Sequence, residues 1–101
     1  MIRTTNDLIN ALLHSPEAGL ILSEADLSPA FFDLRSGLAG ELLQKVVNYR
    51  ARLAIVLADP AAHGERFSEL VREHRRHPSV RFFGSEAEAR EWLNTQAAPQ
   101  V

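Results

Sequence analysis

The stretch RLAIVL at residues 52–57 decides the fold, because its apolar residues follow one another without polar alternation. A strand of this kind is covered on both faces, which is typical of a parallel sheet. Asp59 and Pro60 interrupt the run, and the shorter run LIL at residues 20–22 has the same character. These two segments predict neighbouring strands in a buried parallel sheet.

Helical patterns lie between the predicted strands. Residues 36–49 have a wide apolar face, residues 67–74 have a second amphipathic pattern, and VRFF at residues 80–83 predicts a third strand. Further helices are expected near residues 8–13 and after Ser85. The order α-β-α-β-α-β-α predicts an α/β fold with a three-stranded, mainly parallel sheet and right-handed crossovers.

Length and composition limit the organisation and the function classes. At 101 residues we expect one domain, with a core over about residues 4–95 and a frayed tail at residues 96–101. The net charge of -2 gives no basic field that would attract nucleic acid, and no apolar run approaches the roughly 20 residues that span a bilayer. The absence of cysteine excludes disulfides and suits the cytoplasm. We therefore expect a cytoplasmic protein that binds neither nucleic acid nor membranes.

Ligands of an open parallel sheet collect beyond the carboxyl ends of its strands. The side chains that the sequence places there form a candidate binding rim of Glu24, Asp26, Phe31, Phe32, Asp33, Arg35 and Asp59. Carboxylates in such loops can bind a divalent cation, but aspartates more often cap helices and start turns. We therefore expect no metal at this rim.

The start of the helix over residues 36–49 is a candidate phosphoacceptor or anion site, made of Ser36, Gly37 and Gly40. Backbone N–H groups at a helix start can bind a phosphate. The Gly-Lys-Ser/Thr ending of a Walker loop and the G-x-G-x-x-G pattern are both absent. The competing interpretation is that the glycines allow the helix to pack closely on the sheet.

Known catalytic patterns are missing. The four histidines are spread over three predicted segments without an H-E-x-x-H motif, so we expect them to pack in the core or face solvent rather than bind a metal. Ser36 lacks the G-x-S-x-G context of a hydrolase. Arg72, Arg75 and Arg76 form a basic cluster, which we interpret as a solvated helix face because glutamates lie on the same helix. We expect no catalytic residues, no metal and no cofactor.

The motifs Phe-Phe-Asp-Leu at residues 31–34, Gly-Leu-Ala-Gly at 37–40 and Asn-Tyr-Arg at 48–50 closely resemble the bacterial family catalogued as domain of unknown function 4180. The resemblance extends from about residue 21 to residue 93. The order of elements also resembles STAS domains, the class of the anti-sigma factor antagonists. That looser resemblance implies a phosphorylated serine before the Gly-Leu pair, which by position is Ser36, with Asp33 as the preceding acid. A phosphate there would meet the favourable end of the helix dipole.

The leading hypothesis is a non-enzymatic regulatory or protein-interaction module of STAS-like build, which binds a protein partner through the rim. The alternative is a small-anion or nucleotide-binding domain that uses the start of the helix over residues 36–49. A third hypothesis is that the protein is a purely structural subunit. STAS domains begin with two further strands that this chain lacks, so we expect an exposed sheet edge and a homodimer that covers it.

Overall fold

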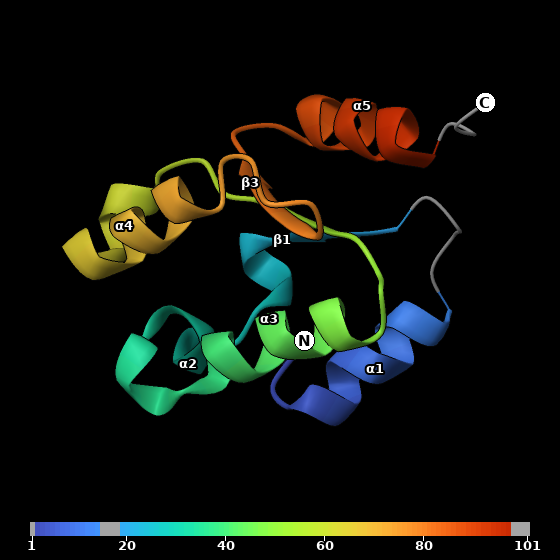
Figure 1. Cartoon of the computed structure of the whole chain (residues 1–101). Coiled ribbons are helices and arrows are strands. Elements are labelled where there is room, and N and C mark those ends of the chain that lie inside the picture. Colours follow the sequence, from blue (N-terminus) through green and yellow to red (C-terminus); the bar gives the residue numbers. More distant parts are fainter. Residues whose placement is uncertain (1, 15–18, 98–101) are drawn as a thin grey trace.

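The computed structural model describes residues 2–14 and 19–97 (Figure 1). Its helices are α1 (Thr5–Leu13), α2 (Pro29–Phe32), α3 (Leu38–Asn48), α4 (Glu65–Glu73) and α5 (Glu86–Ala97). Its strands are β1 (Leu20–Ser23), β2 (Leu53–Val56) and β3 (Val80–Phe83), and three short 3-10 helices are η1 (Glu24–Asp26), η2 (Leu34–Ser36) and η3 (Pro60–His63). The predicted alternation of helices and strands is confirmed, and the 3-10 helices are additions to it.

The three strands form one parallel sheet in the order β1-β2-β3. Leu20 is opposite Leu53 in the first ladder, and Leu53 is opposite Val80 in the second. The predicted three-stranded parallel sheet is therefore confirmed. β2 lies in the centre, where all three of its buried positions are apolar, while β1 and β3 lie at the edges. The homodimer expected through the β1 edge stays a prediction.

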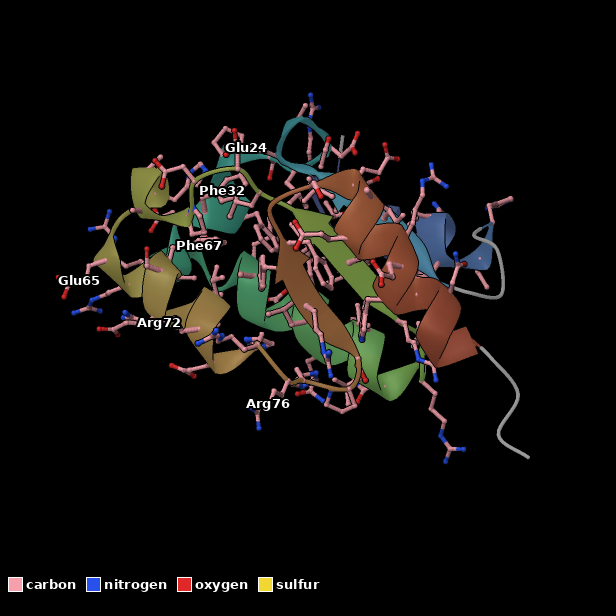
Figure 2. All side chains as sticks on the ribbon, turned by 90° about the horizontal axis from the view of Figure 1, so that it is seen from above. Glu24, Phe32, Glu65, Phe67, Arg72 and Arg76 are labelled. Carbon is pink, nitrogen blue, oxygen red and sulfur yellow. The ribbon has the colours of Figure 1, made fainter. Side chains whose placement is uncertain are left out.

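The sheet separates two apolar clusters. On one face, α1, α2, α3 and α4 contribute to the larger cluster, which includes the fully buried side chains of Leu8, Phe31, Val46 and Phe67. On the other face, α5 is the one described helix, and it places Ala89, Trp92 and Leu93 against Ala54 (Figure 1). Seen from the α5 side, β3 lies beside this helix at the margin of the sheet (Figure 2).

The ends of the folded region differ slightly from the expected core of residues 4–95. Ile2 is buried, its N–H donates to the carbonyl of Asp26, and its own carbonyl accepts from the N–H of Ser28. At the other end α5 continues to Ala97. The rest of the predicted tail, residues 98–101, lies outside the described residues. Among the described helices, none has the length and apolar character that crossing a membrane would require.

The main helix begins two residues later than the sequence predicts. Gly37 adopts a left-handed conformation with φ of 79° and forms the N-cap of α3, so Ser36 belongs to the preceding turn η2. A side chain is disfavoured at positive φ, which explains the glycine at this junction. The chain thus makes a sharp corner between α2 and α3, at the same end of the sheet as the carboxyl ends of the strands.

Candidate functional site

The loops after β1 and β2 meet at the carboxyl edge of the sheet, because the two strands are parallel neighbours. Glu24 begins η1 and His63 ends η3. The Nε2 atom of His63 lies 2.5 Å from Oε1 of Glu24, a hydrogen bond between residues 39 positions apart. The His63 side chain is 21% exposed and that of Glu24 is 54% exposed, so this contact forms at the surface.

An aromatic layer lies beside this hydrogen bond. The ring of Phe32 stacks on the imidazole of His63, with centroids 3.9 Å apart and an angle of 13° between the planes. Phe67 meets Phe32 edge-on at 5.2 Å and His63 at 5.7 Å. Phe67 is fully buried, whereas Phe32 and His63 are partly exposed. The layer therefore connects the larger apolar cluster to the surface.

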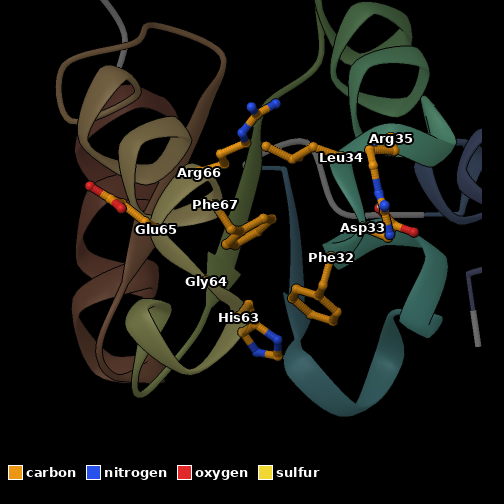
Figure 3. A pocket seen from close by; sticks show the side chains of 9 residues that line it. All are labelled: Phe32, Asp33, Leu34, Arg35, His63, Gly64, Glu65, Arg66 and Phe67. Carbon is orange, nitrogen blue, oxygen red and sulfur yellow. The ribbon is translucent and has the colours of Figure 1, made fainter.

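A pocket of about 470 Å³ opens over this layer, between α2 and η2 on one side and η3 and α4 on the other (Figure 3). We call it the rim pocket. Its lining residues are Phe32, Asp33, Leu34, Arg35, His63, Gly64, Glu65, Arg66 and Phe67. The floor is aromatic and apolar, and Asp33, Arg35 and Arg66 stand beside it, whereas the carboxylate of Glu65 points away from it (Figure 3).

Asp33, Arg35 and Arg66 make up the charged border of the rim pocket. Asp33 Oδ1 accepts from the backbone N–H of Arg35 at 3.1 Å and from its Nε at 3.3 Å. The Arg35 side chain is 88% exposed, so this ion pair contributes little to stability. Arg66 has no hydrogen bond or ion pair from its guanidinium within the part of the chain that the structure describes. Arg66 is thus available to an incoming carboxylate.

The local sequence explains why His63 lies beside Phe32 in the rim pocket. Asp59 accepts from the N–H of Ala61 at 3.1 Å and Pro60 follows it, which together start η3. Gly64 has φ of 99° and ends the turn before α4 begins. This short, capped turn fixes the position of His63 relative to Phe32.

The predicted rim is partly assembled at the rim pocket. Phe32, Asp33 and Arg35 line it, and Glu24 adjoins it through His63. Phe31 differs from the expectation: it is fully buried against Phe32 and Phe67, so it supports the site from beneath and cannot contact a partner.

Asp26 and Asp59 lie at the expected edge but act within the chain. Asp26 accepts from the backbone N–H and the hydroxyl of Ser23, at 2.8 Å and 3.0 Å. Asp59 caps η3 in the same manner. Both carboxylates thus match the competing interpretation, in which aspartates start turns. No group of three or more metal-ligating side chains occurs among residues 2–14 and 19–97.

The three residues of the candidate anion site do not share a pocket. The Ser36 hydroxyl donates to the carbonyl of Ala30 at 2.6 Å and accepts from the N–H of Leu38 at 3.2 Å. The N–H of Gly37 donates to the carbonyl of Leu34. Two N–H groups that a phosphate would need are therefore already in use. A Cβ atom at Gly37 or Gly40 would meet no atom within 4 Å, so close packing does not explain these glycines.

Sequence reasoning missed six lining residues of the rim pocket, namely Leu34, His63, Gly64, Glu65, Arg66 and Phe67. The sequence interpretation places the histidines in the core or in solvent and assigns none of them to the rim. The available signal was the Asp59-Pro60 turn after the second strand, because a parallel sheet brings that turn beside the loop that carries Glu24. The residues that follow this turn, 63–67, therefore belong to the same edge as the predicted rim.

Comparison with known proteins gives one match. The family model with the description Domain of unknown function (DUF4180) matches residues 2–93, which is nearly the whole chain. No curated protein and no solved structure matches the chain. The looser resemblance to STAS domains stays a prediction.

Proposed function

This chain belongs to the family described as Domain of unknown function (DUF4180), and we propose that it is a non-enzymatic interaction module that binds a protein partner at the rim pocket. The observation that carries the proposal is the aromatic floor of Phe32, His63 and Phe67 inside a border of exposed charges. Protein interfaces concentrate their binding energy in such a centre of aromatic residues, surrounded by a polar rim that excludes water.

The chemistry of the pocket also indicates the kind of partner. A partner residue that enters must cover the partly exposed faces of Phe32 and Leu34, which favours an aromatic or aliphatic side chain. Arg66 is exposed and makes no ion pair with a described residue, so a carboxylate beside that anchor would complete the contact. We therefore propose an apolar anchor flanked by an acidic residue.

The alternative function, binding of a small anion or nucleotide at the start of α3, has less support. The hydroxyl of Ser36 and the N–H groups of Gly37 and Leu38 already bond within the chain. Gly37 and Gly40 line a separate groove along α3, where Glu41 and Lys45 offset each other's charge. An anion at the start of α3 would have to displace existing hydrogen bonds.

Charge reversal at the rim pocket tests the proposal. The double variant Arg35→Glu, Arg66→Glu should fold normally, because both side chains are exposed. It should capture its partner from a lysate of the native host at least tenfold less than the wild type, since like charges would face the partner carboxylate. Quantitative mass spectrometry of the captured proteins measures this, followed by titration with the purified partner.

The control for this test is Arg50→Glu, Arg90→Glu, which changes the net charge equally at exposed positions outside the rim pocket. A protein captured by the wild type and by this control, and lost with the rim variant, supports the proposal. If every captured protein is retained equally by all three chains, the rim pocket is not the docking site.

Ser36 links the proposed docking site to regulation. Ser36 is an exposed residue, and the two hydrogen bonds of its hydroxyl hold η2, the turn that carries Arg35 and is capped by Asp33. A phosphorylated Ser36 cannot donate to the carbonyl of Ala30, and it adds a dianion next to the rim pocket. We propose that phosphorylation of Ser36 displaces Asp33 and Arg35 and so weakens partner binding.

Incubation of the purified protein with host lysate and ATP should add one phosphoryl group at Ser36, located by mass spectrometry of peptides. The Ser36→Ala variant should gain none there, and Ser85→Ala should be modified as the wild type is. The phosphorylated protein should bind the partner at least severalfold more weakly. An unmodified Ser36 under all growth conditions would rule out the switch and leave the interaction module intact.

A further inference from the structure

The outer edge of β3 presents unused backbone groups. The N–H of Leu53 donates to the carbonyl of Ser79, and the N–H of Leu57 donates to that of Phe83. Because bonding directions alternate along a parallel strand, the N–H and C=O of Phe82 point away from β2. Neither group has a hydrogen-bond partner among residues 2–14 and 19–97. Such an edge can pair with an added strand.

At the beginning of β3, the backbone N–H groups already have a hydrogen-bond acceptor within the chain. The Nδ1 atom of His77 accepts from the N–H groups of Ser79 and Val80, at 3.0 Å and 3.1 Å. Burial lowers the pKa of His77, and the nearby charges of His74 and Arg81 lower it further. The neutral imidazole therefore remains an acceptor near pH 7. The edge that is open to pairing begins after this cap and is centred on Phe82.

A basic groove lies beside the open edge. It has a volume of about 740 Å³ and is lined by Arg72, Glu73, Arg75, Arg76 and Arg81. Arg72 and Arg76 point away from the body of the protein, from α4 and the turn after it (Figure 2). Four of the chain's 11 lysine and arginine residues thus line one groove that has a single acid, although the net charge of the chain is -2.

The charges of the groove are not neutralised internally. The guanidinium groups of Arg72, Arg75 and Arg76 make no ion pair or hydrogen bond with any residue of the described part of the chain. Arg81 is held in place, because its Nε donates to the carbonyl of His77 at 2.8 Å and its guanidinium lies 5.1 Å from the centre of the Trp92 ring. Arg81 lies on β3 and thus extends the basic surface of α4 to the edge of the sheet. The sequence interpretation of the basic cluster as a solvated helix face did not include this residue.

We propose that β3 binds an acidic segment of a partner protein as an added strand. The outward N–H and C=O of Phe82 pair with the backbone of that segment, and its carboxylates meet the arginines of the groove. A second copy of this chain is a poor occupant, because pairing two β3 edges would bring two clusters of four arginines together. The favoured occupant is therefore a different chain with alternating acidic residues.

A labelled peptide of eight residues that alternates glutamate and valine is the probe. Fluorescence anisotropy should show binding to the wild-type protein, and nuclear magnetic resonance should show that the amide signal of Phe82 shifts. A peptide that alternates lysine and valine should not bind. Arg75→Glu, Arg76→Glu should weaken binding of the acidic peptide at least tenfold. The rim-pocket variant Arg35→Glu, Arg66→Glu, with the same net charge, should change it less than threefold.

Backbone pairing has its own control. N-methylation of alternate amides in the acidic peptide removes the donors on one side of its strand, so one of the two methylation patterns should abolish binding. Equal weakening by both double variants, or undiminished binding of both methylated peptides, would mean non-specific attraction and would overturn the proposal. Failure of the acidic peptide to bind would also overturn it.

Discussion

Replacement of Gly19 by alanine should lower the free energy of unfolding by about 3 kcal/mol or more. Gly19 has φ of 128°, a conformation that residues with side chains rarely adopt. A Cβ atom there would lie 2.7 Å from the carbonyl oxygen of Arg52 and 2.9 Å from Cδ2 of Leu93. The same carbonyl accepts the N–H of Leu20, the first bond between β1 and β2. The substitution would therefore push apart β1, β2 and α5 where they meet.

The matched control is Gly40→Ala, an identical chemical change inside α3. Gly40 is exposed, and a Cβ atom there would meet nothing within 4 Å. This variant should be more stable than the wild type by about 0.5–1 kcal/mol, because alanine restricts the unfolded chain more than glycine does. Urea unfolding followed by circular dichroism measures both. Two variants of equal stability would show that the close contacts at Gly19 carry no cost.

Replacement of Phe67 by alanine should lower the free energy of unfolding by about 3–5 kcal/mol. Phe67 is fully buried, and its ring lies 6.0 Å from that of Phe31, 5.2 Å from Phe32 and 5.9 Å from Phe82. Its removal would leave a cavity between α2, α4 and β3 and would also take away part of the pocket floor. Many domains have a total stability of only about 5–15 kcal/mol, so this variant would be close to unfolding.

The variant Phe67→Leu separates packing from function. Leucine retains most of the buried volume, so the loss should be about 1–1.5 kcal/mol, while the edge-on contacts with Phe32 and His63 disappear. We expect this variant to fold and to bind its partner more weakly than the wild type. Urea unfolding and partner titration measure the two effects. A Phe67→Ala variant as stable as the wild type would contradict the central place of this ring in the core.

The fold follows from the sequence because the first two strands are unbroken apolar runs and the third, VRFF, is apolar except for Arg81. Such runs at residues 20–22 and 53–57 need cover on both faces, and the helices between them make parallel pairing the natural arrangement. The exact start of α3 was not predictable in the same way. It depends on the left-handed conformation of Gly37 and on the hydrogen bonds of Ser36, both of which are set by the corner between α2 and α3.

Of the two sides of the rim pocket, only the one formed by residues 32–35 could be predicted from the sequence. Phe32, Asp33 and Arg35 are close in the sequence and were placed correctly at the carboxyl edge. The other side depends on His63 and Phe67, whose contact with Phe32 requires that β1 and β2 be neighbours and that η3 turn back toward α2. Apolar periodicity also could not tell which of two adjacent phenylalanines is buried, so Phe31 was assigned to the surface.

The separate apolar cluster under α5 has a consequence for proteolysis. Loss of α5 would leave Ala54 and its neighbours without the cover of Trp92 and Leu93, while the larger cluster on the other face keeps its own helices. A chain cleaved between β3 and α5 would therefore expose an apolar sheet face, and such a surface favours aggregation.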